Sequence, residues 1–404
     1  MLAGIFLPSL AQDVAQLEHV AALIRENKIT TAERQLTLFL KSQPNQPVAL
    51  NLMGTIRAKQ GRLAEAETLF VRAASSDARF SGARMNLAYL YMLKREPAKA
   101  VVQLKEILTV EAANAEALVL LGDAHLATGA LAEAEEQYLL ALDGRLENAG
   151  ALLGLAQISR LKGEVKETTL YLTRVATLSA DSKSPEFLYK FALVAMQVGL
   201  SDAAKAALEN ALKLRPNEPA YLLALGNAWL RKGDLFEAEK VFRRLIQLQP
   251  ASDQAQVHLG YVLLNQKKYD EARLWLEKSA RSSAPMPEVF YYLGLVAQEQ
   301  NDDAKAIELF EKAVQKLPSY AHARIALGSS YIKLRNYPRA KEELETAVKL
   351  DPDEPKAHYN LALLYARLKD PARAEQEMRI VEKLKAKGAG ADGVVVLPPN
   401  PSPR

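Results

Sequence analysis

Apolar residues recur along the chain in short blocks with helical spacing, and each block ends at a turn signal. In residues 221–232, Leu222, Leu225 and Trp229 fall on one face of a helix. Gly233-Asp234 then interrupts that face. A second apolar face follows the turn and consists of Ala238, Val241, Phe242 and Leu245. The block therefore predicts two short amphipathic helices joined by a tight turn.

This helix-turn-helix pattern returns every 34 residues, a period that indicates stacked structural repeats. Eleven units fill residues 13–388, and one interval, between the fifth and sixth starts, is 36 residues. Position 20 is alanine in ten of the eleven units, and position 24 is always large and apolar. No segment of the array shows strand alternation with hairpin signals, so the predicted fold class is all-α. The units begin at Asp13, Pro47, Ser81, Ala115, Ala149, Pro185, Pro219, Asp253, Pro287, Ala321 and Pro355.

Position 8 is small in every unit except the first. It is glycine in six units, among them Gly226 and Gly328, and alanine in four. We expect the two helices of a unit to cross here with backbones too close for a larger side chain. Between units, Glu218-Pro219 and Glu354-Pro355 each place a capping side chain before a proline that can open the next helix.

These features resemble the tetratricopeptide repeat, which has Leu-Gly at positions 7 and 8, an aromatic residue near 11, alanine at 20, phenylalanine at 24 and proline at 32. The resemblance covers residues 13–388. It implies a right-handed α-α superhelix, in which the first helix of each unit lines a concave groove. It also implies a non-enzymatic scaffold that binds a protein or peptide. The seventh unit matches the pattern at Leu225-Gly226, Trp229, Ala238, Phe242 and Pro250.

Two units depart from this pattern. The first has His19-Val20 in place of Leu-Gly, which fits an atypical capping repeat. The fifth has Ser159 and Thr168 in core columns, and extra residues follow it within 181–184. We interpret that point as a hinge between repeats 1–5, residues 13–184, and repeats 6–11, residues 185–388.

The two ends of the sequence lie outside the repeats. Residues 1–12 combine an apolar run with the small-x-small spacing of Ser9-Leu10-Ala11 but lack a basic region. Two interpretations stay open, the remnant of an export signal and an N-terminal extension that covers the first helix pair. The first favours a periplasmic or secreted location. Residues 389–404 are rich in glycine and proline and are predicted to be disordered, with a short linear binding motif at residues 394–397 as the alternative.

Composition narrows the classes of protein to consider. With 49% hydrophobic and 25% charged residues, the chain can form a sizeable core, which excludes disorder as its main state. No apolar run approaches the roughly 20 residues of a membrane-spanning helix. The chain has 52 Lys and Arg against 48 Asp and Glu, so its net charge is +4. So small an excess does not indicate a nucleic-acid-binding protein, which needs positive charge clustered on one face. The absence of cysteine excludes disulfides, thiolate metal sites and cysteine nucleophiles.

The sequence predicts no catalytic residue, no metal site and no cofactor. It has no metalloprotease, P-loop, nucleophile-elbow or dinucleotide-binding motif. His125 replaces an aromatic residue in a packing column and is expected to fill the core. His322 and His358 lie on adjacent first helices, but two histidines without a third ligand are a weak metal signal. The five histidines share no repeat position and are His19, His125, His258, His322 and His358.

The resemblance places positions 2, 5, 9, 12 and 13 on the concave side. Of these 55 positions, 31 are apolar, 7 basic and 5 acidic, so the predicted groove is apolar and disfavours RNA, the alternative ligand of helical repeats. Tyrosine and methionine give adaptable contacts with peptides or helices. The candidate groove residues are Met85, Tyr89, Met92, Tyr189, Leu193, Met196, Leu223, Asn227, Arg231, Tyr261, Tyr291, Lys333 and Tyr359.

One known specialisation of this repeat family can be tested directly. The clamp that holds chaperone C-terminal carboxylates requires a Lys/Asn/Asn/Lys/Arg set, and here Thr55, Glu116 and Leu120 replace members of it beside Asn51 and Asn86. We therefore expect another ligand, a partner helix or extended peptide, and a place in cell-envelope or secretion assembly. The alternative is a non-catalytic regulatory subunit of an enzyme complex. The sequence leaves the oligomeric state open.

Overall fold

The computed structural model describes residues 10–142, 148–179 and 182–388. Within these ranges every regular element is a helix, which confirms the all-α prediction. Most of residues 1–12, the tail 389–404 and part of the predicted hinge lie outside the described residues. The export signal, the tail's disorder and the hinge therefore stay predictions.

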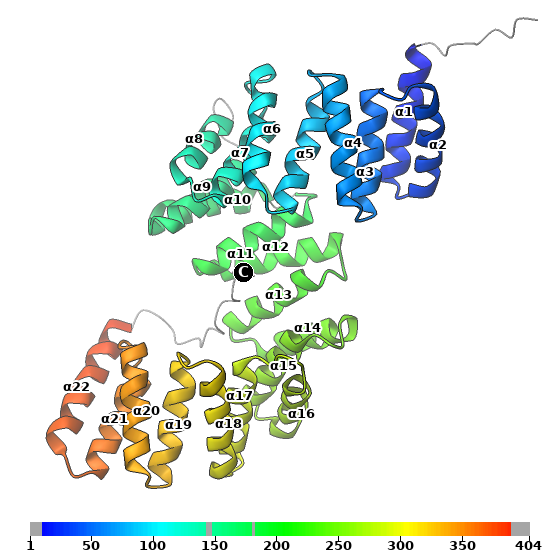
Figure 1. Ribbon diagram of the computed structural model, residues 1–404. Coiled ribbons are helices and arrows are strands. Elements are labelled where there is room, and N and C mark those ends of the chain that lie inside the picture. The colour runs from blue at the N-terminus through cyan, green and yellow to red at the C-terminus, as the bar shows by residue number, and fades with distance from the viewer. Residues whose placement is uncertain (1–9, 143–147, 180–181, 389–404) are drawn as a thin grey trace, which may run out of the picture. The chain divides into compact units, whose positions relative to one another are not determined.

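The chain divides into two compact units, residues 1–182 and 183–404, called unit 1 and unit 2 below. In each unit the helices stand side by side in a row (Figure 1). Unit 1 contains α1 (Leu10–Arg25), α2 (Ile29–Ser42), α3 (Pro47–Lys59), α4 (Leu63–Ser76), α5 (Ser81–Leu93), α6 (Pro97–Val110), α7 (Ala115–Ala127), α8 (Leu131–Leu142), α9 (Ala149–Leu161) and α10 (Val165–Ser179). Unit 2 contains α11 (Pro185–Gln197), α12 (Ser201–Leu214), α13 (Pro219–Arg231), α14 (Leu235–Leu248), α15 (Asp253–Asn265), α16 (Tyr269–Ala280), α17 (Pro287–Glu299), α18 (Asp303–Lys316), α19 (Ala321–Lys333), α20 (Tyr337–Leu350), α21 (Pro355–Arg367) and α22 (Pro371–Gly388).

The packing order of the helices explains why one side of each row is available for a ligand. The two helices of a repeat pack together, and the second helix also packs on the first helix of the next repeat. First helices of neighbouring repeats contact each other as well, for example α3 with α5 and α19 with α21. The first helices therefore form a continuous layer in unit 1 and three contacting pairs in unit 2, α11 with α13, α15 with α17 and α19 with α21. We call the surface made by their positions 2, 5, 9, 12 and 13 the inner face.

The small residue at position 8 is explained by a side chain rather than by crossing backbones. A Cβ added to Gly226 would lie closer than 3.0 Å to the ring of Phe242, the position-24 residue of the same repeat. Gly294 meets Phe310 in the same way. All four aromatic residues at position 24 face a glycine, whereas repeats with alanine at position 8 carry leucine or methionine there. The two columns are thus matched in volume.

Every repeat turns between its helices through a residue in the left-handed region. Its φ lies between 58° and 82° in all eleven repeats, always at position 15. Glycine occupies this position in five repeats, as at Gly233, and Asn, Arg or Lys occupies it in six, as at Arg335. The turn geometry is therefore common to all repeats although the residue type is not.

Of the two predicted helix caps, one is present in the structure, and the polar residue Thr168 in the core of the fifth repeat is buried. Glu354 caps α21 by accepting from the Lys356 N–H at 3.0 Å, whereas Glu218 makes no side-chain cap at α13. Thr168 is fully buried, and its hydroxyl donates to the Glu164 carbonyl at 2.7 Å. The hydroxyl in this core column is thus paired with the backbone of the residue that precedes α10.

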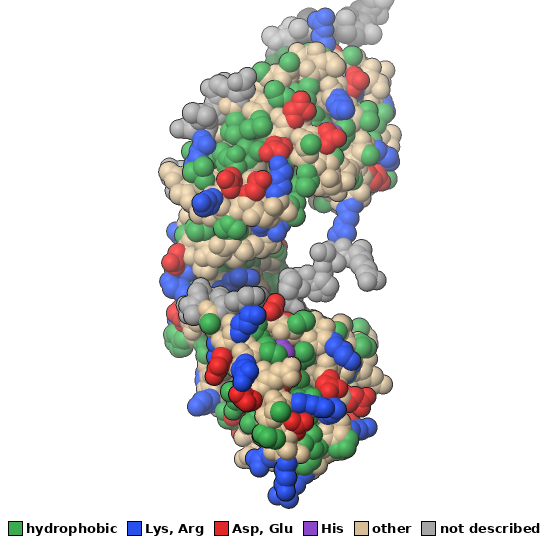
Figure 2. Space-filling view, turned by 90° about the vertical axis from the view of Figure 1, so that its left-hand side faces the viewer, with side chains coloured by type: hydrophobic (Ala, Val, Ile, Leu, Met, Phe, Trp, Pro, Cys, Tyr) green, Lys and Arg blue, Asp and Glu red, His purple; other side chains and the backbone are tan. Residues whose placement is uncertain are grey.

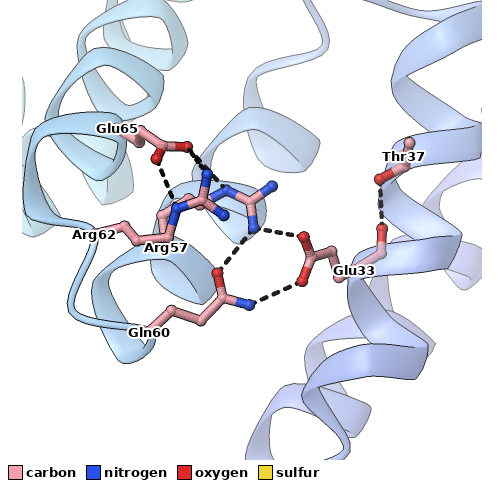
Figure 3. Close-up of polar contacts among 6 residues, drawn as sticks. All are labelled: Glu33, Thr37, Arg57, Gln60, Arg62 and Glu65. Atoms are coloured by element: carbon pink, nitrogen blue, oxygen red, sulfur yellow. Dashed lines mark hydrogen bonds and ion pairs between the residues drawn. The ribbon is translucent and has the colours of Figure 1, made fainter.

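Polar side chains join neighbouring repeats at the edge of the apolar core. Glu33 of α2 accepts from the Arg57 guanidinium at 2.5 Å and from the Gln60 amide at 2.9 Å (Figure 3). Nε of Arg57 also lies 3.4 Å from a carboxylate oxygen of Glu65. Arg62 donates one hydrogen bond of 2.6 Å to each of the two carboxylate oxygens of Glu65. This network ties the first repeat to both helices of the second.

The same arrangement recurs along the array. Glu67, at the equivalent position 21 of the second repeat, accepts from Lys94 at 2.6 Å and from the Tyr91 hydroxyl at 3.1 Å in the third. Glu135, at position 21 of the fourth repeat, likewise accepts from Lys162 of the fifth repeat at 2.7 Å. A carboxylate at position 21 is therefore a recurrent link to the next repeat.

We expect unit 1 to lose stability in acid through these links. Hydrogen bonds from Arg57 and Gln60 lower the pKa of Glu33, and that from Lys94 lowers the pKa of Glu67. A lowered pKa contributes stability that is present above the ordinary value of 4.5 and disappears as the pH falls through the folded-state value. Because these side chains are 29% and 26% exposed, we expect about 1 kcal/mol from each.

Urea unfolding at pH 7 and pH 3.5 measures this effect. Glu33→Gln together with Glu67→Gln should reduce the difference in unfolding free energy between the two pH values. Glu375→Gln is the control, because Glu375 occupies the same repeat position but bonds Arg379 of its own helix. An equal reduction in the control would assign the acid sensitivity to general charge repulsion instead.

Candidate functional site

In unit 1 the candidate groove residues lie on α5. Met85 and Met92 are partly buried against the unit 1 core. Tyr89 is 46% exposed, and its hydroxyl donates to Glu116 at 2.8 Å. Burial and this bond raise the pKa of Tyr89. Of these three residues, Tyr89 alone is exposed, and its ring is held by the hydrogen bond to Glu116 of the next repeat.

In unit 2 the candidate residues of α11 and α13 form an apolar part of the inner face. Tyr189 packs on the ring of Tyr221, with centroids 5.0 Å apart. Leu193 and Leu223 are half-buried, whereas Met196 is only 7% exposed. Met196 therefore contributes to packing, and the surface available to a ligand lies on the other three side chains.

Asn227 supplies a polar group within this apolar surface. Its carbonyl oxygen is buried and has no hydrogen-bond donor in the described part of the chain. An unpaired amide oxygen in such a place costs about 1–3 kcal/mol. A ligand N–H that reached this oxygen would remove the cost.

The eighth and ninth repeats continue the inner face with aromatic rings. Tyr261 of α15 and Tyr291 of α17 both pack on Tyr292, with centroid distances of 5.2 Å and 5.4 Å. Tyr291 also contacts Tyr320, at 5.3 Å. Burial raises the pKa of Tyr291 to about 12, so its phenol stays neutral. The structure brings these candidate rings together in one cluster.

The two candidate cations already have partners within the chain. Arg231 donates to the Met196 carbonyl at 3.2 Å, and Lys333 forms an ion pair with Asp303 at 3.1 Å. Tyr359 is 45% exposed on α21. Nothing in the sequence pattern distinguishes these engaged cations from free ones, because their partners lie in the preceding repeat.

The histidines have separate environments. His322 lies 3.8 Å from Glu354, and His358 lies 2.6 Å from Glu377. Burial lowers the pKa of His258, which packs on Phe242, and burial also lowers that of His125. The described residues contain no group of three or more His, Asp or Glu side chains that could hold a metal ion.

The asparagines that resemble part of the carboxylate clamp bond each other. The side-chain amide of Asn86 donates to the side-chain oxygen Oδ1 of Asn51 at 2.8 Å. With Glu116 engaged by Tyr89, this part of the inner face is occupied by links between repeats. The arrangement does not present a cation set for a carboxylate.

The described surface mixes charges of both signs. On the face drawn in Figure 2, acidic and basic side chains alternate over both units, with hydrophobic side chains between them. Among the residues that the structure describes, no helix is long and apolar enough to cross a membrane.

Two solved structures are among those similar to this chain. Yeast Tom70 is 15% identical with a TM-score of 0.48, and the likeness covers 95% of this chain and 98% of that one. Pseudomonas aeruginosa pilF is 20% identical with a TM-score of 0.45, covering 52% of this chain and 95% of that one.

Curated relatives match part of the chain. The cellulose synthase operon protein C of Xanthomonas axonopodis pv. citri (strain 306) is 27% identical over 261 residues, which are 60% of this chain and 17% of that protein. Human protein O-mannosyl-transferase TMTC3 is 22% identical over 203 residues, which are 49% of this chain and 22% of that protein. The chain thus spans about a fifth of the length of these relatives.

Family models described as tetratricopeptide repeat match more than half of the chain. The matched residues are 51–108, 85–149, 189–253, 237–287, 295–353 and 325–389. The helix pairs and the 34-residue period are those of the same family. The chain belongs to the tetratricopeptide repeat family.

Proposed function

We propose that this protein is a non-enzymatic scaffold that binds a helix or an extended peptide of a partner on the inner face of unit 2. The observation that carries the proposal is the half-buried apolar surface of Tyr189, Leu193 and Leu223 beside the unpaired Asn227 oxygen. Apolar side chains supply contact area, and one polar group without a partner can fix the orientation of a ligand. Tyrosine rings at the surface are among the side chains that dominate binding energy at protein interfaces.

The names of the relatives suggest a setting for such a scaffold. Two bacterial relatives, from Xanthomonas and Komagataeibacter, are named for cellulose synthase operons. A role in cell-envelope or secretion assembly is consistent with those names. The human relatives are named as transferases, which favours a second candidate function, a non-catalytic regulatory subunit of an enzyme complex. Purification of the chain together with an active transferase or synthase would favour this second function.

Replacing Tyr189, Leu193 and Leu223 with alanine should weaken binding of the partner at least tenfold, or about 1.4 kcal/mol. The side chains are half-buried, so we expect the helical content to be retained. Met196→Ala is left out of this variant because its side chain is packed in the interior.

Photo-crosslinking in cells first identifies the partner. A benzophenone amino acid at position 193 should give a specific protein adduct. The same group at position 274 is the control, because Leu274 is 63% exposed on a second helix, away from the inner face. If position 274 gives the same adducts, or the triple variant binds the identified partner unchanged, the inner face is not the binding surface.

A further inference from the structure

Four tyrosines in repeats 8 and 9 of unit 2 lie ring against ring, and we call them the tyrosine cluster. The centroid distances are 5.2 Å from Tyr261 to Tyr292, 5.4 Å from Tyr292 to Tyr291 and 5.3 Å from Tyr291 to Tyr320. Tyr292 and Tyr320 are at most 9% exposed, whereas Tyr261 and Tyr291 are half-buried on the inner face. Faces of such rings carry partial negative charge and attract cations. In the part of the chain that the structure describes, however, the contacts of Lys and Arg with aromatic rings involve other rings.

Two carboxylates adjoin the tyrosine cluster. Burial, a neighbouring phenol and the negative charge of Glu354 together raise the pKa of Tyr291. Burial, the phenol of Tyr291 and the negative charge of Glu288 raise the pKa of Tyr320. Glu354 caps α21 with one carboxylate oxygen, and its other oxygen lies 3.8 Å from the exposed His322. Two negative charges thus lie close to the rings, on side chains that are themselves partly exposed.

Glu288 differs from the two other glutamates at position 2 of a repeat. Glu116 accepts a hydrogen bond from a tyrosine of the preceding repeat. Glu186 forms an ion pair with Arg215 at 2.5 Å. The residue of repeat 9 that corresponds to Arg215, at position 31, is Leu317. Within the described residues Glu288 has no ion-pair partner, so its charge is available to a ligand.

Repeat 6 shows which group fits beside a glutamate at position 2. Burial raises the pKa of Tyr221, and Arg215, which lies beside this tyrosine, acts in the opposite direction. Tyr221 packs on Tyr189, which occupies position 5 as Tyr291 does in repeat 9. The guanidinium of repeat 6 is therefore held by the position-2 carboxylate and lies next to an aromatic pair. Repeat 9 has the carboxylate and the rings but lacks the guanidinium.

We propose that the tyrosine cluster, together with Glu288 and Glu354, binds an arginine side chain of the partner. The inference rests on the proposed function and names the chemistry of the segment that the inner face of unit 2 holds. Arginine fits better than lysine, because its planar guanidinium donates to carboxylates in pairs and stacks on aromatic rings. The cluster begins in repeat 8, directly after the apolar surface of repeats 6 and 7. An extended segment of ten residues spans about 33 Å, or about three helix widths, and can contact both.

NMR of the full chain with 13C-labelled tyrosine rings tests this proposal, with N-acetyl-arginine amide as the probe. The probe should shift the signals of Tyr261 and Tyr291, which Tyr261→Phe and Tyr291→Phe assign. We expect it to bind about fivefold more tightly than N-acetyl-citrulline amide, a matched probe without charge. Glu288→Gln with Glu354→Gln should abolish this preference, and glutamine at 354 keeps an oxygen that can cap α21. Equal affinity of the two probes for the unmodified chain would overturn the proposal.

A second variant leaves every side chain of the site in place. Leu317→Arg should supply the missing guanidinium to Glu288, as Arg215 does to its own glutamate, and weaken binding of the arginine probe about fivefold. Leu317 is 37% exposed, so we expect the variant to fold. Leu317→Gln is the uncharged control and should bind the probe like the unmodified chain. If Leu317→Arg also binds it unchanged, Glu288 does not receive the cation and the proposal is wrong.

The two proposals for unit 2 can fail separately. A specific adduct from position 193, combined with no preference for the arginine probe, would overturn this inference and leave the proposed function in place. Loss of the proposed function would instead appear in the crosslinking experiment, whatever the probe does at the tyrosine cluster.

Discussion

Replacing Gly154 with alanine is expected to destabilise unit 1 by about 3 kcal/mol, the upper part of the range for overpacked cores. A Cβ at Gly154 would lie closer than 3.0 Å to the ring of Tyr138. The ring has no room to shift, because Gly122 lies equally close to it. It is also fully buried and held by a bond of 2.7 Å from its hydroxyl to Asp123.

A double-mutant cycle with Tyr138→Leu measures this clash. Leucine fills the same column in other repeats, and after Leu208 of repeat 6 the position equivalent to Gly154 is an alanine, Ala224. The double variant should therefore be more stable than the sum of the single effects by about 2 kcal/mol. Gly150→Ala in the same helix is the control, since a Cβ there would lie 3.1 Å and 3.8 Å from the methyl groups of Val119 and 3.4 Å from the side-chain oxygen of Asn148. Equal losses for Gly150→Ala and Gly154→Ala in urea unfolding would contradict the packing argument.

Replacing His358 with leucine is expected to destabilise the last repeat by about 2–3 kcal/mol. The buried imidazole joins two acceptors, the Glu377 carboxylate at 2.6 Å and the Pro352 carbonyl at 3.0 Å. Leucine would remove the polar contacts of the imidazole with these two groups from a largely buried place. The loss should appear in chemical unfolding and as faster amide exchange in α22.

The preceding repeat supplies the matched control. There Arg324 occupies the same repeat position and donates to Glu343 at 2.5 Å and to the Pro318 carbonyl at 2.8 Å. His358→Arg should therefore be tolerated. In repeat 7 the residues equivalent to His358 and Glu377 are Leu222 and Val241. The double variant His358→Leu with Glu377→Val should therefore recover most of the lost stability. If His358→Arg lowers the stability as much as His358→Leu, the contacts with Glu377 and Pro352 are not the reason for the loss.

Sequence periodicity predicted the helices because each repeat buries the same columns. The period fixed the phase of every helix pair, including the irregular fifth repeat. The role of position 8 was predicted only in part, since its smallness was visible but its contact, the side chain at position 24, was not. Gly154 lies at position 6, which has no common residue type, so only its contact with Tyr138 of the preceding repeat explains it.

The binding surface was less predictable than the fold. The inner columns can be read from the period, but burial within a column depends on the neighbouring repeats. Met196 is covered, and Arg231 and Lys333 are engaged by groups that lie about one repeat away in sequence. Such contacts depend on pairs of side chains rather than on a column, so a single repeat pattern does not reveal them.

The exposed turn residue at position 15 of each repeat offers a site for chemical modification in protein engineering. A residue with a Cβ costs about 1 kcal/mol at such a turn. A stack whose stability is a sum over many units and interfaces can absorb that cost several times. Six turns already carry Asn, Arg or Lys, and all six side chains are exposed. Four of them, Lys267, Asn301, Arg335 and Lys369, follow one another at intervals of one repeat. A dye, a linker or a solubilising group could be added at these turns without disturbing either packed surface of a repeat.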